Sequence, residues 1–166
     1  MPLINLMKEI IMTNTPKKKI LFLDIDGVLA GEDYLCNRAN GGDFIDPEKV
    51  KLLNSLHCMV VISSSWGDNN GRTEKALKEK GLTLPIVGYT VHYEIGHDWI
   101  VRGNSIAKWL SDNLHGCIGE YQYAIVDDDD DMLMRQAGHF VQTDAHTGIT
   151  ESDVEKLRNI LESNII

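Results

Sequence analysis

The sequence predicts an α/β fold with a mainly parallel sheet of about five strands. Apolar runs of strand length alternate with segments of helical periodicity along the chain, a pattern typical of βαβ units. The run KILFLD, residues 19–24, is continuously apolar up to its aspartate, as expected of a strand that is covered on both faces. At 166 residues the chain is long enough for one hydrophobic core and short for two domains.

The strands are expected where apolar runs of four to eight residues are bounded by polar residues or glycine. They are residues 19–24, 58–65, 84–90, 121–128 and 139–143. Residues 91–103 fit a short hairpin or a loop. The segment Leu29 to Phe44 is polar and glycine-rich, which predicts a flap rather than a further element of the sheet.

Four helices are expected, at residues 46–56, 72–81, 104–114 and 150–163. Asp46 and Asn104 are the expected N-caps of the first and third helices, because short polar side chains accept hydrogen bonds from first-turn N–H groups. Gly81 closes the second helix. The last helix opens with a capping box that begins at Thr150.

Residues 1–16 are expected to form a flexible extension, and residues 17–166 the folded domain. The extension is mildly apolar but contains Lys8 and Glu9 and lacks a basic leader, so it predicts neither a signal peptide nor a membrane span. Met12 is an alternative start. The three cysteines have no paired spacing, which favours a reducing, cytoplasmic setting.

The net charge of −9 is concentrated at two places in the sequence. Seven of the 25 acidic residues are Asp24, Asp26 and the run Asp127 to Asp131, and the remaining acids nearly balance the 16 basic residues. The only basic run, Lys17 to Lys19, precedes the first strand. The sequence has no basic stripe of the kind that would indicate tight binding of nucleic acid.

Polar residues follow three of the predicted strands. Asp24 and Asp26 are two residues apart, so in an extended chain their side chains lie on one side, about 6–7 Å apart. Gly27 allows a sharp turn or the close approach of a ligand. Ligands of a parallel sheet bind beyond the carboxyl ends of its strands, which makes this the expected site.

The second strand ends in Ser63 to Ser65, and the fourth in Asp127 and Asp128. If these two aspartates join the first pair, four carboxylates converge. Two like charges about 4 Å apart repel by roughly 4 kcal/mol at an effective dielectric of 20, so protons or a cation must neutralise the cluster. Oxygen ligands without histidine or cysteine favour a hard cation, and Mg²⁺ is the natural choice beside phosphate.

The motifs DIDGV, a serine after an apolar strand, a basic residue and VDDDDD together resemble the haloacid dehalogenase (HAD) phosphohydrolases. More narrowly, the series FLDIDGVL, VISSSW, RGNSIAKWL, AIVDDDDDM, FVQTD and GIT is similar to the HAD domain of Swiss Army Knife RNA-repair proteins and to small stand-alone relatives from bacteria and phages. The resemblance covers roughly residues 19–150. It implies a single Rossmann-like three-layer domain that is capless or carries a small flap.

The resemblance also implies a role for each residue of the cluster. Asp24 would be the nucleophile that forms an aspartyl-phosphate, and Asp26 the general acid and base. Ser63 would hydrogen-bond a phosphoryl oxygen. Asp127 and Asp128 would hold Mg²⁺ together with Asp24 and the backbone carbonyl of Asp26, with Asp128 favoured as the direct ligand of that pair.

Three residues are candidates for the basic phosphate ligand. Arg102 precedes the third helix and is the preferred one, since a guanidinium binds phosphate in bidentate fashion. Lys108 points away from the apolar stripe of its helix, and Lys75 is a reserve candidate in the first turn of another helix.

Three further residues are expected near the substrate. Gly27 permits its close approach. Ser64 is either a substrate ligand or a loop residue that caps a turn. Trp66 either stacks on a nucleobase or packs against the core.

The expected function is a Mg²⁺-dependent phosphatase that acts on a nucleotide or on the terminal phosphate of a polynucleotide, as in nucleic-acid repair. Neither gap between the motifs holds a folded cap domain, so the site is expected to be open to a phosphorylated small molecule or a nucleic-acid end. Two alternatives stay open: a non-catalytic acidic module that binds Ca²⁺ or a protein, and a phosphoryl transferase acting on a small phosphorylated metabolite. The sequence leaves the oligomeric state open.

Overall fold

The computed structural model describes residues 17–37, 41, 43–91, 94–95, 98–99, 101–114 and 120–163. Its centre is a five-stranded sheet with the order β3-β2-β1-β6-β7, in which every pairing is parallel. The strands are β1 (Lys18–Leu23), β2 (Met59–Ile62), β3 (Ile86–Tyr89), β6 (Tyr121–Asp127) and β7 (Phe140–Gln142). The α/β architecture predicted from the sequence is confirmed. The expected extension, residues 1–16, lies outside the described residues.

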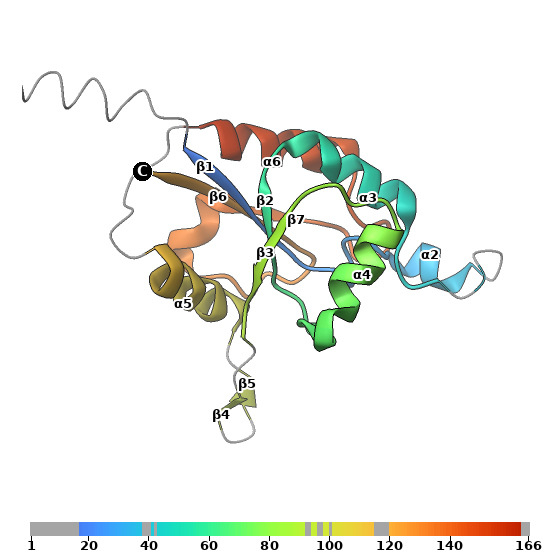
Figure 1. Ribbon diagram of the computed structural model, residues 1–166, viewed down its shortest axis with the longest axis horizontal. Coiled ribbons are helices and arrows are strands. Elements are labelled where there is room, and N and C mark those ends of the chain that lie inside the picture. Colours follow the sequence, from blue (N-terminus) through green and yellow to red (C-terminus); the bar gives the residue numbers. More distant parts are fainter. Residues whose placement is uncertain are drawn as a thin grey trace, which may run out of the picture.

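Helices cover both faces of this sheet (Figure 1). One face packs against α3 (Pro47–Leu53), α4 (Arg72–Glu79) and α6 (Glu151–Glu162), and the other against α5 (Arg102–Leu114). The chain therefore forms three layers, as the Rossmann-like expectation requires. No helix of the described residues is long and apolar enough to cross a membrane.

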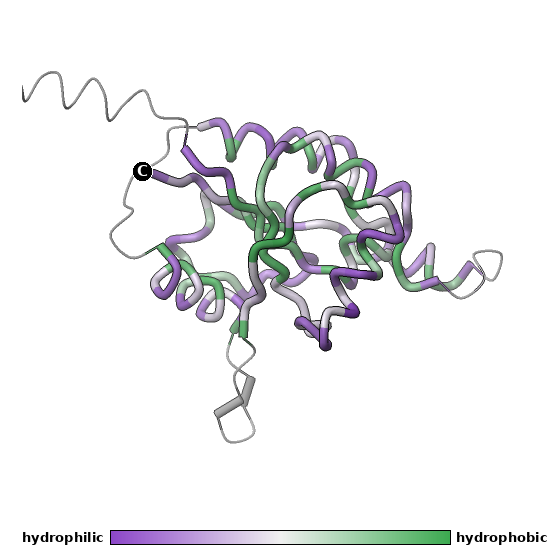
Figure 2. Tube along the Cα trace, viewed as in Figure 1, coloured by the Kyte–Doolittle hydropathy of each residue, from purple (hydrophilic) through white to green (hydrophobic). Residues whose placement is uncertain are grey.

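The last four residues of strand β1 are all apolar because they supply both hydrophobic cores. Leu21 and Leu23 belong to the larger cluster beneath α3, α4 and α6, whereas Ile20 and Phe22 belong to the smaller one beneath α5. All four side chains are almost completely buried, and Figure 2 shows the hydrophobic residues gathered in the central strands. This is the pattern of a strand that is covered on both faces.

Two of the predicted helix starts are confirmed. The Asp46 carboxylate accepts a hydrogen bond of 2.9 Å from the backbone N–H of Glu48 at the start of α3. Thr150 and Asp153 form the reciprocal capping box that opens α6. Both starts depend on residues close in sequence, which is why the sequence reveals them.

The predicted start of α5 is wrong. The helix begins at Arg102, so Asn104 lies inside it and is not the N-cap. Instead, the Asp131 carboxylate accepts a 2.8 Å hydrogen bond from the Arg102 N–H, and the Asp131 carbonyl accepts one of 3.2 Å from the Gly103 N–H. The first-turn donors are satisfied by a loop that is distant in sequence.

Several short elements connect these layers. They are α2 (Glu32–Cys36), the 3₁₀ turns Asn54–Leu56, Asn69–Gly71 and Met134–His139, and the antiparallel pair β4 (Glu94–Ile95) and β5 (Asp98–Trp99). The pair confirms the hairpin interpretation of residues 91–103. Helix α2 lies within the expected flap and is anchored by hydrogen bonds from Glu32 and Asp33 to the Ala145 and His146 carbonyls. Flap residues 38–40 and 42 lie outside the described residues.

Replacement of Thr150 by alanine tests the capping box of α6. Loss of an N-cap side chain costs about 1 kcal/mol, which corresponds to a fall in Tm of about 2–4 °C for a chain of this length. Thermal unfolding followed by circular dichroism measures this. The matched control is Ser152→Ala, an exposed position in the same first turn, and an equal loss of stability there would contradict the capping role of Thr150.

Candidate active site

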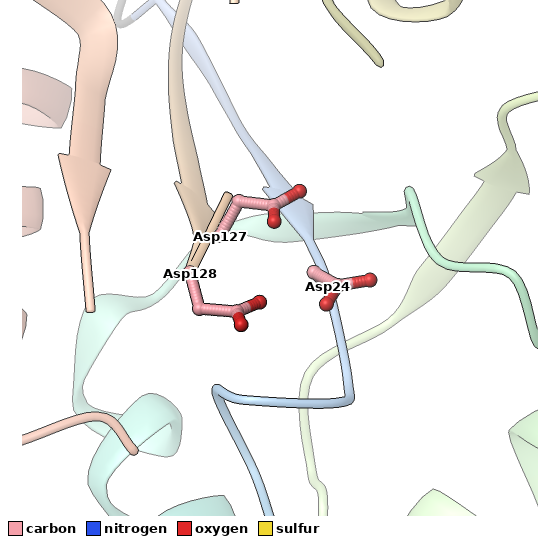
Figure 3. A group of neighbouring side chains, drawn as sticks. All are labelled: Asp24, Asp127 and Asp128. Atoms are coloured by element: carbon pink, nitrogen blue, oxygen red, sulfur yellow. The ribbon is translucent and has the colours of Figure 1, made fainter. Parts of the chain in front are cut away.

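Three carboxylates meet where β1 and β6 end (Figure 3). Asp24 directly follows β1, Asp127 is the last residue of β6, and Asp128 comes next. One oxygen of each lies within 4.8 Å of the others. The neighbouring strand ends are tied together by backbone hydrogen bonds from Asp24 to Val126 and from Ser63 to Leu23. The sheet thus brings together residues about one hundred positions apart in the sequence.

Arg102 is the cation that lies against this cluster. Its Nη1 donates to Asp24 Oδ1 at 3.2 Å and also to the Ser63 carbonyl, and its Nε lies 3.5 Å from Asp127 Oδ2. The Arg102 side chain is only 13% exposed. One guanidinium therefore contacts two of the three carboxylates and partly offsets their repulsion.

Arg102 does not neutralise the cluster completely. Burial raises the pKa of Asp24 to about 7, although Arg102 and a hydrogen bond from Ser64 oppose this shift. Burial also raises the pKa of Asp127, to about 8, and the negative charge of Asp24 adds to the effect. The pKa of Asp128 is raised as well, chiefly by burial. Without a cation, the site holds protons near neutral pH.

The cluster has the features of a site for a hard cation. Its donors are all carboxylate oxygens, which Mg²⁺ prefers. Asp127 Oδ2 is buried and has no hydrogen-bond partner in the described part of the chain, so it has an unused acceptor for a ligand. Three of the four carboxylates that were expected to converge, those of Asp24, Asp127 and Asp128, are thus brought together. The Asp26 carboxylate is not part of this group, and the expected contribution of its backbone carbonyl stays a prediction.

Gly27 leaves the space that Asp128 occupies. Its φ of +68° is in the left-handed region, and a Cβ there would lie 2.2 Å from Asp128 Cγ. The Gly27 carbonyl accepts a 3.0 Å hydrogen bond from Thr143 Oγ1 at the end of β7. Glycine is therefore required both by the turn and by the position of the carboxylate.

Ser63 and Ser64, the first two of the three serines that follow β2, face different neighbours. Ser63 Oγ accepts a 3.2 Å hydrogen bond from Thr90 Oγ1, whereas the Ser64 hydroxyl donates to the Asp24 carboxylate. Both serines are buried. The contacts place Ser64, rather than Ser63, beside the expected nucleophile.

Asp26 is exposed and is held by a different residue. Trp66 Nε1 donates to both of its carboxylate oxygens, at 3.2 and 3.0 Å. Trp66 is half-buried and packs against the larger hydrophobic cluster. The expectation that Trp66 contacts substrate stays a prediction, and its packing against the core is confirmed.

The other basic candidates lie on helix surfaces. Lys75 on α4 is exposed and forms a 3.8 Å ion pair with Glu79. Lys108 on α5 is exposed and forms a 2.7 Å ion pair with Asp112. Of the three candidates, Arg102 is the one that the structure places against the acidic cluster.

The sequence reasoning missed two threonines, Thr90 and Thr143. Each directly follows a strand, β3 and β7 respectively, and each hydrogen-bonds a residue of the site. Their position at the end of a predicted strand could have identified them, because polar residues that follow the strands of a parallel sheet meet at one edge.

A parallel three-layer α/β sheet with acidic residues at the ends of β1 and β6 is the arrangement expected of a HAD-type hydrolase. The family model of the HAD domain in Swiss Army Knife RNA repair proteins matches residues 20–154. This is most of the chain, so the chain belongs to that family. Membership confirms the resemblance inferred from the motifs and supports a hydrolase of the HAD phosphatase type. No curated protein and no solved structure matches the chain significantly.

Replacement of Gly27 by alanine should disrupt the cation site. Its Cβ would displace Asp128, so the rise in Tm caused by Mg²⁺ should fall. For a ligand at about 100 times its Kd the stabilisation is about 2.7 kcal/mol, and most of it should be lost. Thermal scans with and without MgCl₂ measure this.

Gly71→Ala is the matched control, since Gly71 has a φ of +77° and no atom of the described residues lies within 4 Å of the added Cβ. It carries a similar backbone penalty away from the site and should retain the full effect of Mg²⁺. An undiminished Mg²⁺ effect in Gly27→Ala would count against the site.

The raised pKa values predict how stability depends on pH. A carboxyl whose pKa is higher in the folded than in the unfolded state stabilises the fold below its unfolded value, near 4, and this contribution is lost as pH rises through the folded value. In EDTA, the Tm should therefore fall between pH 5 and pH 8, the window set by Asp24 and Asp127.

Asp127→Asn should flatten this dependence, whereas the exposed Asp33→Asn should leave it unchanged. Thermal scans at several pH values measure both. A Tm of the unsubstituted protein that rises from pH 5 to pH 8 in EDTA would contradict the electrostatic account.

Proposed function

We propose that this protein is a Mg²⁺-dependent phosphatase that hydrolyses a phosphomonoester through an aspartyl-phosphate on Asp24. The observation that carries the proposal is the convergence of Asp24, Asp127 and Asp128 with the Arg102 guanidinium in contact. A nucleophilic carboxylate, a cation site and a phosphate ligand are the parts that phosphoryl transfer requires.

Asp24, Asp127 and Asp128 would hold the metal, with the backbone carbonyl of Asp26 as a further ligand and Asp128 as the favoured direct ligand of the β6 pair. Bound Mg²⁺ would neutralise the carboxylates and the negative charge of the phosphoryl group. Asp127 Oδ2, which is buried and has an ion pair with Arg102 but no hydrogen-bond partner among the described residues, supports this assignment.

Asp24 is the proposed nucleophile, and its surroundings suit an anion that must be oriented. Arg102 and Ser64 both donate hydrogen bonds to its carboxylate. A phosphoryl group transferred to Asp24 would lie within reach of the same donors, which orient and stabilise it. Ser63 supports this edge through its carbonyl, which accepts from Arg102, and through Thr90.

Asp26 is the proposed general acid and base. It would give its proton to the leaving oxygen as the P–O bond breaks, and then take a proton from the water that attacks the aspartyl-phosphate. Its exposed position two residues from Asp24 places it on the solvent side, where leaving group and water are exchanged.

A nucleotide or a polynucleotide terminal phosphate is the proposed substrate. The RNA-repair context of the family supports it. The net charge of −9 opposes contacts with a long nucleic-acid backbone, so recognition should be concentrated on the terminal phosphate. Gly27 adjoins Asp128, Ser64 adjoins Asp24 and Trp66 adjoins Asp26, so these three residues would lie near that phosphate.

Asp24→Asn tests the nucleophile. Because asparagine cannot form an acyl phosphate, phosphate release should fall to background while the fold is retained. Asp26→Asn should lower the rate by about 10²–10⁴-fold, the usual contribution of a positioned acid or base. Phosphate release from mononucleotides and from 3′- and 5′-phosphorylated oligonucleotides in MgCl₂ measures both, with Asp33→Asn as the control. Full activity in Asp24→Asn would exclude the mechanism.

A further inference from the structure

Asp24 and Asp26 are held in different ways although they are two residues apart. Asp24 is 4% exposed and is fixed by Arg102 and Ser64. Asp26 is exposed, and an exposed carboxylate is ordinarily free to change rotamer. A bridge between Asp26 and Ala30 fixes its backbone. The orientation of the carboxylate itself is set by the indole N–H of Trp66, which lies 3.2 and 3.0 Å from its two oxygens.

The Trp66 ring is itself fixed by the fold. The chain turns directly after β2, with a 3.0 Å hydrogen bond from the Gly67 N–H to the Ser64 carbonyl. The backbone N–H of Trp66 also donates a 3.4 Å hydrogen bond to Ser64 Oγ. The indole packs against the larger hydrophobic cluster, so its single N–H donor has a defined direction. Ser64 thus links the turn that carries Trp66 to Asp24.

We propose that Trp66 is a positioning residue that holds Asp26 in place as the general acid and base. This inference rests on the proposed function, since it assigns a role within that reaction. The shared N–H occupies one acceptor site of each oxygen and leaves the others available to carry the proton. When protonated, a carboxyl group held in this way delivers its proton to the leaving oxygen, and becomes a carboxylate, without first losing rotational freedom, which is an advantage in the transition state.

A positioning role differs from substrate stacking in what it does to the rate. Protonation matters most when the leaving group is a poor one, because a weakly acidic alcohol or phenol must gain a proton as the P–O bond breaks. A good leaving group such as p-nitrophenolate departs without it. Loss of Trp66 should therefore slow poor leaving groups selectively, whereas loss of a stacking contact would raise KM.

The experiment measures kcat/KM in MgCl₂ for p-nitrophenyl phosphate and phenyl phosphate, which have similar size. Trp66→Phe keeps an aromatic ring and removes the N–H. Because a positioned acid contributes about 10²–10⁴-fold, we expect this variant to lose about tenfold on phenyl phosphate and less than about twofold on p-nitrophenyl phosphate. In an Asp26→Asn background the same substitution should cause no selective loss.

Two further variants serve as controls. Trp109→Phe makes the same chemical change on α5, where the ring packs against Phe22 at 5.5 Å, and should leave the ratio between the two substrates unchanged. Site-specific replacement of Trp66 by 3-benzothienylalanine keeps the bicyclic shape and lacks the N–H, and it should reproduce the selective loss even if Trp66→Phe is unstable.

Equal losses on the two substrates, a change confined to KM, or a selective loss that persists without Asp26 would each overturn the positioning role and leave the phosphatase proposal standing. Absence of phosphate release from both substrates and from nucleotides in the unsubstituted protein would instead overturn the proposed function.

Discussion

Repulsion among buried carboxylates is the constraint on which this site depends. Two parallel strands deliver Asp24, Asp127 and Asp128 to one small space, where burial makes each negative charge more costly. Arg102 offsets part of that cost by contacting Asp24 and Asp127. The remainder raises the pKa values of the three acids, and a divalent cation bound among them, as we propose, would relieve it.

The position of Arg102 follows from the way α5 is attached to the sheet. Ile106 belongs to the hydrophobic cluster beneath the helix, while Asp131 binds the first-turn N–H groups. The same acidic segment that supplies two carboxylates of the cluster therefore also supplies the cap of the helix that carries the compensating charge. A substitution in this acidic segment can therefore change both the start of α5 and the balance of charge around Arg102.

Asp24 and Asp26 show how one short motif supports two roles. Asp24 directly follows β1 and is buried, whereas Asp26 precedes the turn at Gly27 and is exposed. Their donors differ accordingly: Arg102 for the first and the Trp66 indole for the second. In the proposed mechanism, these different environments would allow two chemically identical groups to act as nucleophile and as acid.

The sequence by itself determined the features that depend on local chemistry. The apolar run that ends β1, the Asp46 cap and the Thr150 capping box are set by neighbouring residues. The order of the motifs sufficed to indicate the HAD family. The sequence also favoured Arg102 over Lys75 and Lys108, and the structure places it against the cluster. Only the tertiary structure decided that Ser64 lies beside Asp24 and that Asp131 caps the start of α5. These choices depend on packing between layers and on charge compensation in a buried space, and neither has a signature in the spacing of residues along the chain.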